Sequence, residues 1–167
     1  VLDAASAVGI SGTISVPADG DEDGMPDCWE VAFGLDVEKD DSADDPDDDG
    51  LTNLDESKLC LDLADEILAA AQYSAACLDP QKADSDGDGM PDGWEVDNDL
   101  DPFQDDSALD VDHDKLSNLK EFQAKRDPWS DDMAIDTDGD GMPDAWEILR
   151  DFDPASEVDG VGDADGD

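Results

Sequence analysis

Hydrophobic residues are sparse along most of this chain and come in short groups at regular intervals. Met25 with Trp29 and Leu51 with Leu54 are typical groups, and each is followed within about two turns by Gly, Asp or Pro. Apolar residues three or four positions apart, ended so soon by helix breakers, predict helices of about two turns. The stretches between them are polar, so we expect a loop-rich chain with short α-helices and little sheet.

Two segments depart from this pattern. Residues 10–16 alternate between apolar and polar side chains and include β-branched residues, which predicts one β-strand within an N-terminal strand and linker at 1–17. That strand belongs to a preceding domain, folds against the rest of the chain, or adds to a sheet in another subunit. Residues 57–83 form the most apolar stretch and predict a helical insertion, either a hairpin or one long helix. The insertion interrupts a repeat array over 18–167.

Aspartates at alternate positions define the repeat. Residues 136–147 read DTDGDGMPDAWE, and complete matches to this spacing start at 19, 45, 84, 110 and 136. The first, third and fifth loops read M-P-D-x-W-E at positions 7 to 12 and are called M-type here. The second and fourth read L-[ST]-N-L-x-E and are called L-type. A chance acidic tract does not produce five phased loops with alternating ends, so the chain is a tandem repeat.

The spacing D-x-D-x-D-G-x5-E is the sequence form of a calcium loop. A cation that binds six to eight oxygens takes carboxylates from positions 1, 3 and 5, a carbonyl from position 7 and a bidentate carboxylate from position 12. Position 6 needs a positive φ, which favours glycine. The predicted metal ligands, including position 9, are Asp19, Asp21, Asp23, Met25, Asp27 and Glu30; Asp45, Asp47, Asp49, Leu51, Asn53 and Glu56; Asp84, Asp86, Asp88, Met90, Asp92 and Glu95; Asp110, Asp112, Asp114, Leu116, Asn118 and Glu121; Asp136, Asp138, Asp140, Met142, Asp144 and Glu147; and Asp163, Asp165 and Asp167 of an unfinished sixth start.

The M-type loops carry proline at position 8 and tryptophan at position 11. Proline has no N–H for a β-bridge between partner loops and suits the first turn of a following helix. We expect each indole to anchor a small core with the aliphatic residue two positions on, which is Val31, Val96 or Ile148.

The fourth loop differs at position 6, where Lys115 replaces glycine. A side chain at positive φ costs about 1 kcal/mol or more, and a lysine charge near the ion opposes binding. We therefore expect this loop to fill last. His113, the only histidine, is expected to lie in solvent.

Charge sets the strongest constraint on the chain. Asp and Glu number 51 against 8 Lys and Arg, for a net charge of −43. Such a chain stays disordered unless cations form part of its folded state, and it is a poor ligand for nucleic acid. One Ca²⁺ in each of five loops leaves −33. We therefore expect more than five ions, with linker aspartates sharing them, namely Asp40, Asp41, Asp105, Asp106, Asp131 and Asp132.

Three cysteines suggest one disulfide and one free thiol. A straight helix over Cys60 to Cys77 holds its ends about 25 Å apart, so either the insertion folds back or one of the two pairs with Cys28. We favour a bridge that includes Cys77.

The repeated loops, with acidic linkers and Asp-Pro punctuation over 19–167, resemble thrombospondin type 3 repeats of the kind found in secreted bacterial proteins. The resemblance implies an extended array around many calcium ions, an extracellular or cell-surface location, and a role in adhesion or as a spacer. Lys115, the insertion and the unfinished last loop depart from the family pattern.

No residue pattern indicates catalysis, since the chain lacks Cys-His or Ser-His pairs and a Gly-rich phosphate loop. No apolar run is long enough for a membrane span, and no signal peptide is recognised. We expect a calcium-rigidified structural protein that acts as spacer, adhesive module or filament subunit, with copies joined through the N-terminal strand or the unfinished loop. The alternatives are a calcium buffer or sensor attached to a secreted enzyme, and a halophilic acidic protein that needs only salt.

Overall fold

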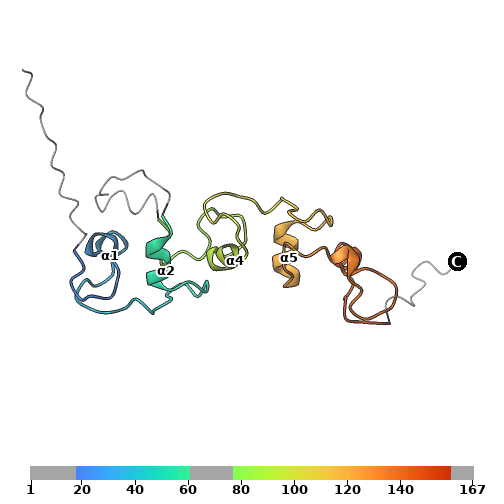
Figure 1. Cartoon of the computed structure of the whole chain (residues 1–167), viewed down its shortest axis with the longest axis horizontal. Coiled ribbons are helices and arrows are strands. Elements are labelled where there is room, and N and C mark those ends of the chain that lie inside the picture. Colours follow the sequence, from blue (N-terminus) through green and yellow to red (C-terminus); the bar gives the residue numbers. More distant parts are fainter. Residues whose placement is uncertain (1–17, 61–76, 159–167) are drawn as a thin grey trace, which may run out of the picture.

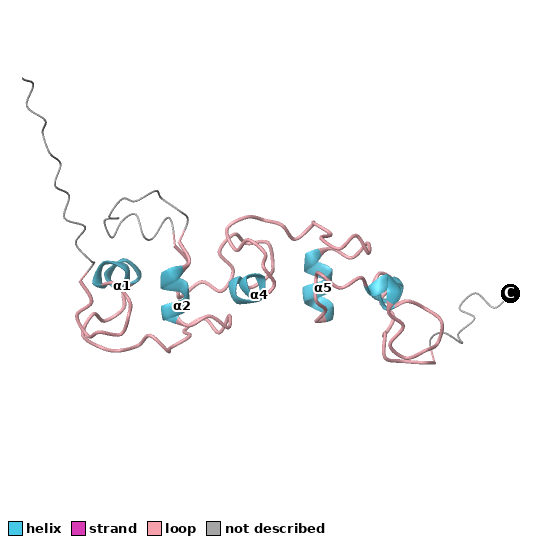
Figure 2. Ribbon diagram, viewed as in Figure 1, coloured by secondary structure: helices cyan, strands magenta, loops and turns pink. Residues whose placement is uncertain are grey.

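The computed structural model describes residues 18–60 and 77–158, and loops make up most of them (Figure 2). The helices are short and follow one another along the long axis rather than forming a bundle (Figure 1). They are α1 (Asp27–Phe33), α2 (Asn53–Lys58), α4 (Asp92–Asp97), α5 (Asn118–Ala124), the 3₁₀ turn η1 (Asp132–Ala134) and α6 (Asp144–Ile148). The expected N-terminal strand, most of the helical insertion and the sixth loop start lie outside the described residues.

Each of the five loops is closed by the same backbone hydrogen bond. The N–H of position 9 donates to the carbonyl of the residue just before position 1, at 2.8 to 3.0 Å. The five bonds are Asp27 to Ala18, Asn53 to Asp44, Asp92 to Ala83, Asn118 to Leu109 and Asp144 to Ile135. A helix begins at the closing residue, which places the position 12 glutamate in its first turns. In the M-type loops the proline immediately precedes that helix, with φ near −70°.

Neighbouring loops pack in pairs, an M-type loop with the L-type loop that follows it. A Cβ on Gly24 of the first loop would lie 3.3 Å from a methyl carbon of Leu54 in the second. The same contact recurs at 3.4 Å between Gly89 of the third loop and Leu119 of the fourth. In both pairs the leucine at position 10 of the L-type loop therefore packs beside the position 6 glycine of the preceding loop.

The best-formed apolar cluster lies under α1. Trp29 and Phe33 are one helical turn apart and their ring centroids are 5.0 Å from each other, with Met25 and Cys77 completing the cluster. The prediction that Val31 joins this core is wrong, because Val31 is 61% exposed on the opposite face of the helix. Phenylalanines also contact the other M-type indoles, with Trp94 against Phe122 and Trp146 against Phe152.

A disulfide holds together the two residues that flank 61–76. Cys60 and Cys77 form a disulfide and an isolated antiparallel bridge, the only β-type pairing within residues 18–60 and 77–158. Of the two alternatives left by the cysteine count, the structure has the fold-back, and the free thiol is Cys28.

The second and third loops meet at Gly93, in the first turn of α4. Its N–H donates to Oδ2 of Asp49 at 3.2 Å, and a Cβ built on it would lie 2.3 Å from the carbonyl oxygen of Asp49. Cys28 and Ala145 occupy the same loop position elsewhere, so the requirement for glycine is specific to this contact.

We expect Gly93→Ala to push these two loops apart and to lower the melting temperature in calcium, at a cost of about 1–3 kcal/mol. Gly87→Ala is the matched control. Nothing lies within 4 Å of its added Cβ, so it pays only for a φ of +85°, about 1 kcal/mol. Equal melting temperatures for the two variants would contradict a steric role for Gly93.

Candidate metal centres

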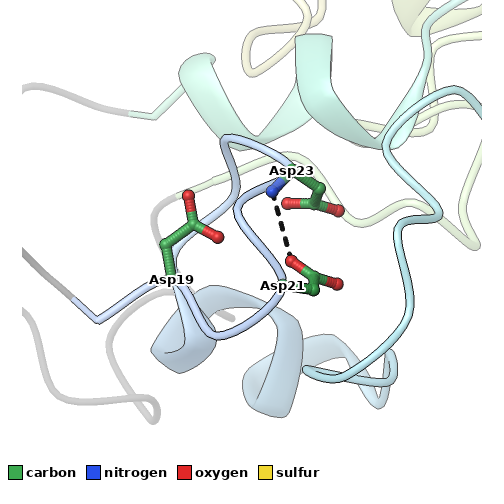
Figure 3. A group of neighbouring side chains, drawn as sticks. All are labelled: Asp19, Asp21 and Asp23. Atoms are coloured by element: carbon green, nitrogen blue, oxygen red, sulfur yellow. Dashed lines mark hydrogen bonds between the residues drawn. The ribbon is translucent and has the colours of Figure 1, made fainter.

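The first kind of acidic group is formed by positions 1, 3 and 5 of one loop. Asp19, Asp21 and Asp23 present carboxylate oxygens within 4.8 Å of one another on a single turn of chain (Figure 3). The same grouping occurs at positions 1, 3 and 5 of the second and third loops. The sequence predicted this convergence from spacing alone.

Backbone N–H groups hold the aspartates of every loop in place. Position 6 donates to the carboxylate of position 1 at 3.0 to 3.2 Å, and position 7 donates to that of position 5 at 2.7 to 2.9 Å. These bonds occupy only part of each carboxylate. Within the described residues, Oδ2 of Asp21, Asp23 and Asp86 is buried without a hydrogen-bond partner.

Two positions of each loop, 4 and 6, have positive φ. The expectation for position 6 is confirmed in all five loops, and Lys115 adopts φ +85° there despite its side chain. The positive φ at position 4 was not predicted, and Glu22, Asp48 and His113 are left-handed there. Gly87 and Gly139 at this position of the third and fifth loops were the available signal. Late filling of the fourth loop stays a prediction.

The glutamates of position 12 are buried almost completely. Glu30, Glu56, Glu95 and Glu121 are 0–1% exposed. Neither carboxylate oxygen of any of the four has a hydrogen-bond partner among the described residues. Buried carboxylates are ordinarily paired or bound to metal, so these side chains mark where a cation is needed.

Burial also moves the proton affinity of these glutamates. Burial, with a smaller contribution from the charges of neighbouring aspartates, raises the pKa of Glu56 and Glu95 to about 9, of Glu121 to about 8 and of Glu30 to about 7. Near neutral pH these ion-free sites therefore favour the protonated carboxyl, and a bound divalent cation would supply the compensating charge in place of the proton.

A second kind of acidic group joins the first and the third loop to the linker that follows each of them. Asp23 and Glu30 converge with Asp41, and Asp88 and Glu95 converge with Asp106, again with oxygens within 4.8 Å. Each linker aspartate lies 22 residues after position 1 of its loop. The position 5 and position 12 carboxylates thus face both the loop and the linker, a suitable arrangement for two ions that share ligands.

Only the second aspartate of each linker pair is buried. Asp41, Asp106 and Asp132 are 7%, 6% and 1% exposed. The aspartate before each of them is exposed, and its carboxylate accepts a hydrogen bond from the residue two positions later in the same turn. The sequence predicted the pairs as ion ligands without distinguishing their two members.

The L-type asparagine of position 9 ties the linker to the next loop. Asn53 Nδ2 donates to the carbonyl of Asp41 at 2.9 Å, and Asn118 Nδ2 donates to that of Asp106 at 3.1 Å. The amide oxygens of both side chains are buried with no hydrogen-bond partner among the described residues. These neutral oxygens are therefore candidate ligands for an ion in the preceding linker group.

The M-type aspartate of position 9 is used differently. Asp27 accepts a hydrogen bond from the N–H of Gly20, and Asp92 accepts from both the N–H and the hydroxyl of Ser85. Asp144 does the same with Thr137. These side chains brace position 2 of their own loop, so a direct or water-mediated ligand role for them stays a prediction.

The donor set fits a hard cation that prefers oxygen. Carboxylates, carbonyls and amides suit calcium, which accepts more oxygens and a looser geometry than magnesium. The sole histidine lies in solvent as expected, with Nδ1 3.0 Å from the carbonyl oxygen of Asp110. The position 7 residues Met25, Met90 and Leu116 bury their side chains fully, so they offer an ion only backbone oxygen.

Comparison of the chain with protein-family models, with curated proteins and with solved structures returned no match. Among the described residues, no helix has the length and apolarity to cross a membrane.

Proposed function

We propose that this chain is an extracellular calcium-binding structural protein. Calcium rigidifies the repeat, which then acts as a spacer, an adhesive module or a filament subunit. The observation that carries this proposal is the set of four deeply buried glutamates without hydrogen-bond partners among the described residues. A chain that buries such groups needs cations to stabilise its folded state.

Calcium fits the proposed extracellular location as well as the oxygen ligands. Loops of this ligand type bind in the range of about 10⁻⁴ to 10⁻³ M in extracellular modules, where calcium is abundant. The disulfide between Cys60 and Cys77 supports the same compartment, because such bonds persist in oxidising surroundings.

The number of ions tests the proposal. The first and third loops each have two acidic groups and the second loop has one. Together with the ligand spacing of the fourth and fifth loops, these groups predict more than five bound Ca²⁺. Native mass spectrometry in calcium should show this count, and Asp41→Asn with Asp106→Asn should reduce it by about two. Asp40→Asn with Asp105→Asn is the matched control and should leave the count unchanged. Five ions or fewer in the unaltered chain would contradict the role given to the linker aspartates.

A further inference from the structure

Arg126 lies among carboxylates at the junction between the fourth and fifth loops. Its Nη2 donates to Oδ2 of Asp144 at 2.7 Å, and its Nε is 3.5 Å from Oδ2 of Asp132. The arginine side chain is 24% exposed, whereas the Asp132 and Asp144 side chains are 2% and 0% exposed. Arginine carries a permanent charge on a planar group suited to bridging two carboxylates.

The position of Arg126 recurs in other loops, but its charge does not. The N–H of Leu35, Leu100, Arg126 and Phe152 each donates to the carbonyl of the position 12 glutamate of its own loop, at 2.8 to 2.9 Å. These four residues are therefore structurally equivalent. In three of them an apolar side chain occupies the place where the fourth loop has a cation.

The carboxylates around Arg126 also correspond to groups described above. Asp132 donates its N–H to Oδ2 of Asp114 at 2.9 Å, as Asp106 does to Oδ2 of Asp88 at 3.2 Å. One difference stands out. At the Asp106 junction the neighbouring position 9 residue is a neutral asparagine, whereas here it is Asp144, which adds a buried negative charge.

We propose that Arg126 is an internal cation that takes over part of the role of calcium at this junction. It neutralises Asp132 and Asp144, so the fourth and fifth loops stay packed together at low calcium concentrations. At those concentrations the equivalent junctions, at Asp41 between the first and second loops and at Asp106 between the third and fourth, come apart. Glu121 is not paired with Arg126, so the arginine lowers the calcium requirement of the junction without removing it. The proposal rests on the proposed function, since it concerns how that calcium dependence varies along the chain.

Hydrogen–deuterium exchange along the full chain, measured across a series of calcium buffers, tests the proposal. In the unaltered protein, peptides from residues 126–144 should reach half-protection at lower free calcium than peptides around Asp41 and Asp106. Arg126→Leu introduces the residue found at 35 and 100. It should raise the half-protection point of 126–144 by about tenfold, the scale of one lost charge-assisted hydrogen bond, and leave the segment around Asp41 unchanged.

Arg126→Lys keeps the charge without the bridging geometry and should give an intermediate shift, which separates charge from packing. The proposal is overturned if the three junctions of the unaltered chain share one half-protection point, or if both variants leave that of 126–144 unmoved. Protection that is independent of calcium in every segment would instead sink the proposed function. The two failures are thus distinguishable.

Discussion

Removing calcium with excess EGTA at ordinary ionic strength is expected to abolish most of the helical circular dichroism signal. The helices have five to seven residues, and isolated helices shorter than about 12–15 residues are marginal in water. Among the described residues, 9 hydrophobic side chains are buried against 13 polar or charged ones. Without cations, the buried carboxylates oppose folding and the small core does not compensate.

Restoring ions one kind at a time provides the control. Calcium should recover the helical signal and the blue-shifted emission of the fully buried Trp29. Potassium chloride alone should not, which separates this protein from a halophilic acidic protein. A calcium sensor would keep a folded state in EGTA and expose an apolar groove on calcium addition. An unchanged spectrum and melting curve in EGTA would falsify the dependence on metal.

The local form of the loops followed from sequence because each feature has a cause within a few residues. Alternate aspartates place carboxylates around one turn of chain, and a proline at position 8 sets where the helix begins. The prediction for Val31 is wrong because Trp29 and Val31, two residues apart, point to different sides of α1. Position 4 was missed because three of the five loops accept a non-glycine residue at positive φ there.

Contacts between loops were less accessible from sequence. Asp40 and Asp41 are adjacent residues of the same type, so the sequence does not distinguish them. The turn of the linker directs Asp41 toward Glu30. From sequence alone, Gly93 looks like a helix position that accepts a larger side chain. The contact with the Asp49 backbone, which excludes one, is visible only in the structure. The repeat spacing places Arg126 where the first and third loops have Leu35 and Leu100, five residues after the position 12 glutamate. Its carboxylate partners depend on how the fifth loop folds against the fourth.

Acidity is expected to act in opposite directions with and without calcium. The raised pKa values of the four buried glutamates mean that the folded, ion-free chain binds more protons than the unfolded chain between the ordinary glutamate pKa of 4.5 and about 7 to 9. Their protonated forms thus contribute stability that is fully present below about pH 4.5. That contribution is lost as pH rises through the folded-state values. Metal-free protein should therefore gain helical signal as pH falls from about 9 to 5.

Calcium is expected to reverse the trend, because a bound ion would favour the ionised carboxylates. Its apparent affinity should increase with pH over the same range, and the loaded chain should keep its melting temperature at pH 8, where the ion-free chain is least ordered. Glu56→Gln removes one of the most strongly shifted groups and should flatten the pH response of the ion-free chain while weakening calcium binding to the second loop. Glu38→Gln alters an exposed glutamate and should change neither. Parallel pH profiles with and without calcium would mean that protons and ions do not compete for these glutamates.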